Sequence, residues 1–255
     1  MRLRILKRRC RISNTRGYSK DKNPPRTSQA RARRTGQVIM LAVTYALFGV
    51  VLFLCAGRLD WTMGWVLIGL YVLYVLFGAM FVLPRNPRAF DESVRWGPGT
   101  RLWDRLWALL YVPTPYVMAA LAGLDAVRFR WSAMPLALSA FGAALLVGGM
   151  MLAAWTMLAN RYFSTTVHVD SERGHRTVTS GPYRWVRHPS YAGAVLAAVG
   201  APLLLGSWWA LVPGAFTAAL FVVRTAREDR DLPSMLDGYP DYARRVRYRL
   251  LPGVW

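Results

Sequence analysis

Two polar segments in the last third of the chain contain the residue types that could do chemistry. The first, residues 181–193, combines Arg, Tyr, Trp, His, Pro and Gly just where a long apolar run begins. The second starts where this run ends, with Arg224 and the acidic pair that begins at Glu228. His188 and Tyr191 of the first segment can donate and accept hydrogen bonds, and the carboxylates of the second can bind a positive charge. Together these groups predict a polar pocket of the kind that enzymes use.

The apolar run between the two segments, residues 191–223, is longer than one membrane crossing needs. Gly206-Ser207 interrupts it, with Pro202 and Pro213 on either side. We interpret it as a tight helical hairpin with arms of about 15 residues, which is short for a perpendicular crossing and indicates a tilted or internally packed hairpin. A short hairpin brings its two ends together, so the two polar segments would face one pocket. One long kinked helix is the alternative.

The other apolar residues also come in blocks. A helix that crosses a bilayer core of about 30 Å needs roughly 17 to 25 residues without charge. Four blocks meet this requirement: 37–56, 62–84, 106–124 and 135–158. The chain is 54% hydrophobic with a mean hydropathy of +0.22, which is unlike an ordinary soluble domain. The sequence therefore predicts an all-α polytopic membrane protein with four transmembrane helices plus a carboxy-terminal transmembrane helical hairpin.

The net charge of +20 is distributed as in a membrane protein and not as in a nucleic-acid-binding protein. Residues 1–34 carry 13 of the 33 Lys and Arg and only Asp21 as an acid. With a cytoplasmic amino terminus, 30 basic residues lie inside, and Arg58, Arg128 and Arg130 lie outside. The positive-inside rule thus predicts cytoplasmic termini and a cytoplasmic pocket, and the basic tail is expected to contact anionic lipids.

These features divide the chain into three regions. Residues 1–35 are expected to form a basic, disordered cytoplasmic tail, because they are rich in Arg, Ser, Asn and Pro. Residues 36–158 would form a transmembrane scaffold, whose third span is expected to kink at Pro113 and Pro115. Residues 159–255 carry the polar motifs and the hairpin.

Cysteine and histidine spacing predicts neither a disulfide framework nor a metal site. Cys10 lies in the basic tail, and Cys55 lies near the end of the first span. The three histidines, His168, His175 and His188, lie within one region but have no Cys or acidic ligands at suitable spacing. No metal is therefore expected.

Several ordered motifs with compatible spacing resemble those of one known family. They are Val178-Thr179-Ser180-Gly181-x-Tyr183, Arg187-His188-Pro189-Ser190-Tyr191-x-Gly193, Arg224-x-x-x-Glu228-Asp229-x-x-Leu232, Gly238-Tyr239-Pro240-Asp241-Tyr242, Arg245-Val246 and Leu251-Pro252. At these residues the chain resembles the isoprenylcysteine carboxyl methyltransferase family, within the integral-membrane methyltransferases that include phospholipid N-methyltransferases. The resemblance covers residues 165–252.

The resemblance implies S-adenosylmethionine as cofactor, bound at the cytoplasmic end of the bundle. Carried over residue by residue, the cofactor contacts are His175, Arg176, Thr177, Val178, Tyr183, His188, Pro189, Ser190, Tyr191 and Glu228. Arg224 matches the arginine that the family uses toward the substrate, and we assign it the catalytic role. Two positions depart from the pattern, because His168 replaces a glutamine of the eukaryotic members and Asp229 replaces a glutamate.

The residue types suit this cofactor and a lipophilic acceptor that enters from the bilayer. Glu228 can bind the cofactor's ammonium group, His188 can donate to its carboxylate, and Tyr183 with Val178 can form a wall for its adenine. A carboxylate acceptor could be oriented by Arg224, whereas an amine acceptor would need a base, for which Asp229 is the candidate. The identity of the acceptor and the oligomeric state stay open.

The resemblance thus implies a membrane methyltransferase, most like one that O-methylates the carboxyl group of isoprenylcysteine. The alternatives are a phospholipid or other small-molecule N- or S-methyltransferase, an NADPH-dependent membrane reductase of the sterol or steroid kind, and a non-catalytic membrane adaptor. A soluble Rossmann-type methyltransferase is not supported, because no Gly-x-Gly-x-x-Gly motif is present.

Overall fold

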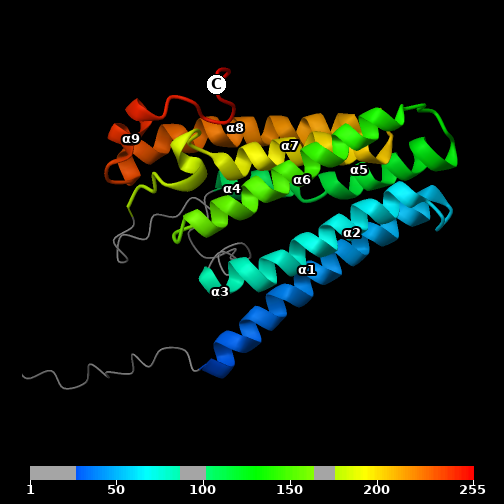
Figure 1. Cartoon of the computed structure of the whole chain (residues 1–255), viewed down its shortest axis with the longest axis horizontal. Helices are drawn as coiled ribbons and strands as arrows, with labels where there is room; N and C mark the ends of the chain where they lie inside the picture. Colours follow the sequence, from blue (N-terminus) through cyan, green and yellow to red (C-terminus); the bar gives the residue numbers. More distant parts are fainter. Residues whose placement is uncertain (1–26, 87–101, 164–175) are drawn as a thin grey trace, which may run out of the picture.

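The computed structural model describes residues 27–86, 102–163 and 176–255, without the side chains of residues 27–34 and 37. These residues form helices and turns and contain no strand, which confirms the all-α fold class. Figure 1 shows the helices running side by side along one long axis, with α9 and the carboxy terminus at the end of the bundle where α7 begins.

The first two spans form an antiparallel pair. They consist of α1 (Thr27–Ala56), α2 (Thr62–Phe77), the π-helical turn η1 (Gly78–Val82) and the short α3 (Leu83–Arg85). Gly57, in the turn between α1 and α2, has a φ of 73°, a left-handed conformation that costs glycine little. Helix α1 begins ten residues before the predicted span, so residues 27–35 are helical, whereas residues 1–26 of the predicted disordered tail lie outside the described residues.

The third span is divided at its proline. It consists of α4 (Leu102–Tyr111), α5 (Thr114–Ala122) and the π-helical η3 (Gly123–Arg128). Proline cannot donate a backbone hydrogen bond, and the helix breaks at Pro113 as predicted. The Thr114 hydroxyl donates to the carbonyl of Tyr111 at 2.8 Å, so one carbonyl at the break keeps a partner inside the membrane.

The carboxy-terminal apolar run is a hairpin, and the alternative of one long helix is wrong. The last helices are α6 (Leu136–Ala159), the 3₁₀ turn η5 (Gly181–Arg184), α7 (Pro189–Leu205), α8 (Leu211–Met235) and α9 (Tyr239–Arg245). Gly206 ends α7 with a φ of 75°, and the chain turns directly into α8. Asp125 of η3 accepts hydrogen bonds from the Ser207 and Ser132 hydroxyls and from the backbone of Trp209, which fixes the hairpin turn to the third span.

Helix α7 is packed inside the bundle, as its shortness predicted. It lies against α6 along a line of glycines. A Cβ added to Gly149 would lie 2.4 Å from the carbonyl oxygen of Gly193, and a Cβ added to Gly200 would lie 2.5 Å from the backbone nitrogen of Leu146. Backbones can approach this closely only where side chains are absent, and this is the usual basis of helix association in a membrane.

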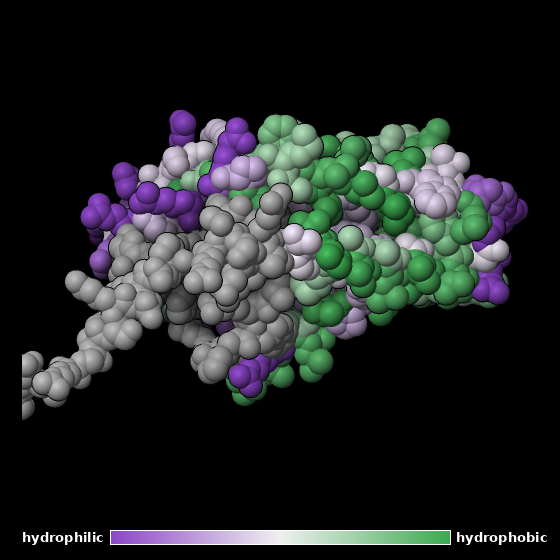
Figure 2. Space-filling view, turned by 90° about the horizontal axis from the view of Figure 1, so that it is seen from below, coloured by the Kyte–Doolittle hydropathy of each residue, from purple (hydrophilic) through white to green (hydrophobic). Residues whose placement is uncertain are grey.

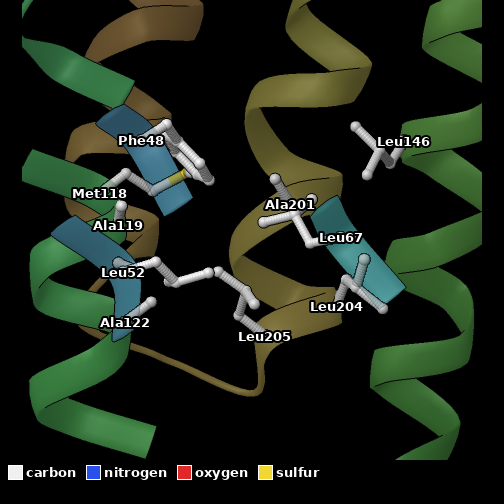
Figure 3. Close-up of a cluster of buried hydrophobic side chains, with 11 residues drawn as sticks. Phe48, Leu52, Leu67, Met118, Ala119, Ala122, Leu146, Ala201, Leu204 and Leu205 are labelled. Atoms are coloured by element: carbon white, nitrogen blue, oxygen red, sulfur yellow. The ribbon is translucent and has the colours of Figure 1, made fainter. Parts of the chain in front are cut away.

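One apolar cluster joins the first helix pair to the rest of the bundle. Figure 3 labels those of its side chains that come from α1, α2, α5, α6 and α7: Phe48, Leu52, Leu67, Met118, Ala119, Ala122, Leu146, Ala201, Leu204 and Leu205. Ala210, just before α8, completes the cluster. Leu52, Leu67 and Leu146 are fully buried. Because the cluster spans five helices, it holds the membrane segments in one bundle that can position the polar end.

The outer surface is that of a polytopic membrane protein. Among the described residues, four stretches are long and apolar enough to cross a membrane: Val38–Ala56, Thr62–Arg85, Leu102–Arg128 and Leu136–Ala159, with Pro189–Leu205 as a shorter apolar helix. Large apolar side chains such as Leu54 and Leu109 are about 70% exposed on this surface. Figure 2 shows a hydrophobic band between two hydrophilic ends, the pattern that a bilayer imposes.

Candidate active site at the open end of the hairpin

The two ends of the hairpin meet in a buried hydrogen-bonded triangle. The Tyr191 hydroxyl at the start of α7 donates to Oε1 of Glu228 on α8 at 2.6 Å. The Nε of Arg224 donates to the same oxygen at 2.8 Å and to the Tyr191 hydroxyl at 3.0 Å. Arg224 and Glu228 are four residues apart on one helix, so they share a face that points toward α7. The sequence-predicted residues of the two polar segments are therefore in direct contact.

Helix α4 contributes two residues to this cluster that the sequence did not predict. Asp104 Oδ1 lies 3.4 Å from Nη2 of Arg224, and the guanidinium carbon lies 4.3 Å from the ring centroid of Trp107. Arg224 is only 3% exposed, and a guanidinium that is this deeply buried needs compensating charge and hydrogen bonds. The only sequence signal for Asp104 was an acidic residue at the boundary of an apolar block, which is too common to identify a site.

A second cluster, centred on Asp229, is next to the first. The carboxylate binds Arg187 Nη1 at 2.9 Å and Arg249 Nε at 2.8 Å, and it accepts a hydrogen bond from the Tyr239 hydroxyl at 2.7 Å. Burial raises the pKa of Asp229, but the polar contacts of His188, Tyr239 and Arg249 and the charge of Arg187 outweigh burial and hold the pKa well below its usual range. Asp229 thus joins α8 to α9 and to the carboxy-terminal segment, and it is a poor general base.

His188 lies between the two clusters. Its Nδ1 is 3.9 Å from Glu228 Oε2, its Nε2 is 3.5 Å from Asp229 Oδ1, and its ring is parallel to that of Tyr191. Nε2 is buried without a hydrogen-bond partner among the described residues, and the same holds for Nε of Arg187. Buried polar atoms of this kind are normally satisfied, so these two are candidates for contact with a polar ligand.

Tyr183 forms the neighbouring wall. Its hydroxyl accepts a hydrogen bond from Asn160 Nδ2 at 3.0 Å, and its carbonyl accepts one from the Tyr242 hydroxyl at 2.8 Å. Burial raises the pKa of Tyr183 to about 12, although the hydrogen bond from Asn160 acts in the opposite direction. The phenol is therefore neutral at physiological pH and offers an aromatic surface. Asn160 was not among the predicted residues, although it lies at the end of α6 where a cap is common.

The other predicted residues are placed as follows. Pro189 is buried at the first position of α7, and Ser190 lines a cavity described below. Thr177 donates to the carbonyl of Asp237 at 2.8 Å, which joins its segment to the α8–α9 turn. Arg176 is exposed and Val178 is partly buried. His168 and His175 lie outside the described residues.

A cavity of about 400 Å³ lies beside this site, in the membrane part of the bundle. Its lining comes from α1, α2 and α4 to α8, and at the polar end it includes Tyr111, Ser190 and Phe221. The Phe221 ring lies 5.4 Å from the ring of Tyr191, and Phe221 precedes Arg224 by three residues on the same helix. The polar cluster thus lies next to a largely apolar cavity, from which Phe221 and Ser190 separate it.

Comparisons with known proteins identify the part of the chain that carries this site. The family model described as the isoprenylcysteine carboxyl methyltransferase (ICMT) family matches residues 140–234. Relatives named protein-S-isoprenylcysteine O-methyltransferase include form B of Arabidopsis thaliana, which is 30% identical over 112 residues, covering 43% of this chain and 57% of that protein. The Schizosaccharomyces pombe protein is 32% identical over 40% of this chain and 44% of that protein. The Mus musculus protein is 35% identical over 43% of this chain and 40% of that protein.

The chain thus matches about half of the length of such relatives, or less. Among solved structures, the eukaryotic intramembrane Ras methyltransferase ICMT is similar at 18% identity. That comparison covers 89% of this chain and 97% of the other, with a TM-score of 0.45.

Proposed function

We propose, from the match of residues 140–234 to the isoprenylcysteine carboxyl methyltransferase family model and from the motifs, that the chain is an S-adenosylmethionine-dependent membrane methyltransferase of this family. Its acceptor is lipophilic, and the reaction is most like carboxyl O-methylation of isoprenylcysteine. The observation that carries this proposal is the buried triangle of Arg224, Tyr191 and Glu228, which contacts the cavity wall through Phe221.

The side chains at the site fit the charged part of S-adenosylmethionine. The cofactor has an ammonium group and a carboxylate on one carbon, so it needs an acidic partner and hydrogen-bond donors side by side. Glu228 is the acidic partner, since its Oε2 faces His188 and not Arg224. His188 Nε2 and Arg187 Nε are the buried polar atoms that could donate to the carboxylate.

The rest of the cofactor pocket is proposed from the family motifs. Tyr183 and Val178 provide the aromatic and apolar wall for the adenine. Pro189, Ser190 and Tyr191, in the first turn of α7, also contact the cofactor. His175, Arg176 and Thr177 complete the set of contacts. When bound, S-adenosylmethionine supplies a methyl group on a positively charged sulfur.

Within this scheme Arg224 orients the acceptor. Tyr191 and Glu228 of the hairpin and Asp104 of α4 hold the guanidinium, so it approaches an acceptor carboxylate in a fixed position. A charge-assisted contact aligns such a carboxylate without protonating it, and its oxygen stays nucleophilic. The apolar chain of the acceptor occupies the cavity, which keeps water away from the reacting oxygen.

The low pKa of Asp229 favours an oxygen acceptor over a protonated amine. Methylation of a protonated amine requires a base, and Asp229, the candidate at the site, is bound by two arginines. A carboxylate is already deprotonated near neutral pH and needs no base. N-methylation of a phospholipid or other small molecule is therefore the less favoured form of the proposal.

We also propose that both termini and the site are cytoplasmic. The support is the distribution of charge in the sequence, because the predicted topology assigns 30 of 33 basic residues to cytoplasmic segments and three to the other side. On that side the basic residues 1–34 contact anionic lipids. S-adenosylmethionine then enters from the cytoplasm and the acceptor from the bilayer.

Ligand binding by the full chain tests the proposal. The protein is purified in lipid nanodiscs and titrated calorimetrically with S-adenosylhomocysteine and with NADPH, and lipid extracts are then incubated with methyl-labelled S-adenosylmethionine. We expect binding of S-adenosylhomocysteine and label in a base-labile ester. Binding of NADPH without binding of S-adenosylhomocysteine would establish a membrane reductase and overturn the proposal, and binding of neither would favour a non-catalytic adaptor.

A further inference from the structure

Asn86, at the end of the second span, connects the first helix pair to the end of α6. Its Nδ2 donates to the carbonyl of Met157 at 3.0 Å and to the carbonyl of Asn160 at 2.9 Å. Asn86 is only 5% exposed, so both hydrogen bonds are shielded from water, which strengthens them. The first helix pair, which the sequence presents as scaffold, thus reaches the polar end of the bundle.

The local sequence explains why α3 ends at Asn86. Residue 87 is a proline, and a proline disfavours the helical conformation in the residue before it. Asn86 accordingly leaves the helix, with a φ of −137° and a ψ of 76°. Close by, the fully buried Val82 of η1 packs against Phe163 and the last turn of α6. Figure 1 shows α3 ending beside the end of α6, where an apolar contact and two hydrogen bonds are combined.

The residue that Asn86 binds has its orientation fixed at several polar groups. The backbone nitrogen of Asn160 donates to the carbonyl of Thr156 at 3.0 Å, and its Oδ1 accepts from the backbone nitrogen of Tyr162 at 2.8 Å. A backbone N–H only donates, so Oδ1 faces Tyr162 and Nδ2 faces the Tyr183 hydroxyl, to which it donates at 3.0 Å. With Asn86 on its carbonyl, Asn160 is held in one position and in turn holds Tyr183.

Helix capping explains only part of this arrangement. The last carbonyls of a helix have no partner within it, and Asn86 supplies donors for two of them. Any donor at this place would serve as a cap. The chain of hydrogen bonds continues, however, from the end of α6 to a residue of the site, and a cap does not require this continuation.

Tyr183 is held at both ends. Asn160 binds its hydroxyl, the Tyr242 hydroxyl donates to its carbonyl at 2.8 Å, and its side chain packs against the apolar cluster around Tyr242. Its phenol is within electrostatic reach of Glu228, the proposed partner of the cofactor's ammonium group. The ring proposed as the adenine wall is therefore positioned by α9 on one side and by the end of α6 on the other.

We propose that Asn86 and Asn160 are positioning residues for Tyr183 and thereby set the affinity of the site for its cofactor. The inference rests on the proposed function, in which Tyr183 contacts S-adenosylmethionine, and it extends the site to a residue of the first helix pair. A ring that is held in place before binding loses less freedom when the ligand binds, so the affinity is higher. Neither asparagine belongs to the cluster around Arg224, so the methyl transfer step itself does not depend on them.

Asn86→Leu tests the inference, because leucine keeps the approximate size of the side chain and removes both donors. The full chain in nanodiscs is titrated calorimetrically with S-adenosylhomocysteine. Initial rates of methyl transfer to a lipid extract give the KM for S-adenosylmethionine and kcat. We expect Kd and KM to rise about fivefold, as for the loss of one neutral hydrogen bond, and kcat to change by less than about twofold.

A control variant separates positioning from a general loss of stability. Asn86→Leu leaves two carbonyls without their donor, so its melting temperature falls as well. Ser207→Ala also removes a buried hydrogen-bonded group, because the Ser207 hydroxyl donates to Asp125 and accepts from the backbone of Ala210. It does so at the hairpin turn, at the opposite end of α7 from the site. We expect a lower melting temperature and unchanged affinity for Ser207→Ala, and an equal loss of affinity in both variants would overturn the inference.

Tyr183→Phe removes the hydroxyl through which the two asparagines act. Its affinity for S-adenosylhomocysteine is expected to fall as in Asn86→Leu. The double variant should bind no more weakly than either single variant, because both changes break the same connection. Additive losses would overturn the inference. Unchanged affinity in Tyr183→Phe would also overturn it, even if Asn86→Leu does not fold.

The outcomes distinguish the inference from the proposed function. If the wild type and Asn86→Leu bind S-adenosylhomocysteine equally well, the function stands and the inference is overturned. If the wild type binds NADPH and not S-adenosylhomocysteine, the function fails, and the same variants are titrated with NADPH. Weaker binding of NADPH by Asn86→Leu then supports the positioning role, and equal binding overturns it. If the wild type binds neither ligand, both are overturned.

Discussion

Arg224 and Asp104 are 120 residues apart in the sequence, yet Arg224 Nη2 lies 3.4 Å from Asp104 Oδ1 inside the bundle. The pair joins α8 of the hairpin to α4 of the third span. Trp107 of α4 strengthens the connection, because its ring lies under the guanidinium and its indole nitrogen donates to the carbonyl of Leu220 at 3.3 Å. The position of the proposed substrate-orienting arginine is therefore set by two parts of the chain.

Replacing Asp104 tests whether α4 positions this arginine. In Asp104→Asn the guanidinium loses a charged partner and shifts, and we expect turnover to fall about a hundredfold, the usual cost of misplacing a reacting group by about 1 Å. Binding of S-adenosylhomocysteine should change little, because Glu228 and His188 stay in place. Asp241→Asn is the control, since it removes an exposed carboxylate that pairs with Arg244. Equal turnover in both variants would exclude a positioning role for Asp104.

Replacing Glu228 and replacing Arg224 are expected to have different effects on cofactor binding and turnover. Glu228→Ala removes the proposed partner of the cofactor's ammonium group, and the affinity for S-adenosylhomocysteine should fall about 10- to 100-fold, as for the loss of a charged hydrogen bond. Arg224→Ala should retain most of this affinity and lose turnover. Calorimetry and initial rates separate the two effects. If both variants methylate normally, the site assignment is wrong.

Asp229 should make the stability of the folded protein depend on pH in the acidic range. The folded protein holds the pKa of this carboxyl below its usual value of about 3.9, so its contribution to stability is complete above that pH and is lost as the pH falls further. Asp229→Asn leaves Arg187 and Arg249 without their carboxylate and should cost about 3 to 5 kcal/mol at pH 7. Thermal unfolding of both proteins at several pH values checks this. The difference between them should shrink as the pH falls below 3.9, and a constant difference would contradict the assignment.

The contact between α6 and α7 can be tested with adjacent glycines. In Gly149→Ala the new Cβ meets the carbonyl oxygen of Gly193 at 2.4 Å, so the helices must separate, and we expect a loss of about 1 to 3 kcal/mol in the free energy of unfolding. Gly148→Ala is a matched control, because nothing lies within 4 Å of its Cβ position. Denaturation in mild detergent compares the two, and similar melting temperatures would show that the helices can move apart without cost.

The sequence by itself determined the membrane architecture. The relevant features are local: uncharged blocks as long as a bilayer is thick, the break at Gly206 and the division at Pro113. Lipid offers no hydrogen bonds to the backbone, so an apolar block in a membrane must be helical, and its local sequence is sufficient to place the helix. The adjacency of Tyr191 and Glu228 also followed, because a tight hairpin brings its two ends together. The long-helix alternative failed at Gly206, where the chain adopts a left-handed conformation and turns back.

Only the tertiary structure decided which further residues meet at the site. Asp104, Trp107 and Asn160 are ordinary boundary residues in the sequence, and they acquire a role because the packing of α4 and α6 against the hairpin brings them to Arg224 and Tyr183. Packing also separated the acidic pair, as Glu228 faces Tyr191 and Arg224 while Asp229 faces Arg187 and Arg249. Adjacent residues of a helix point in directions about 100° apart, and only the neighbours of the helix determine what each of them meets.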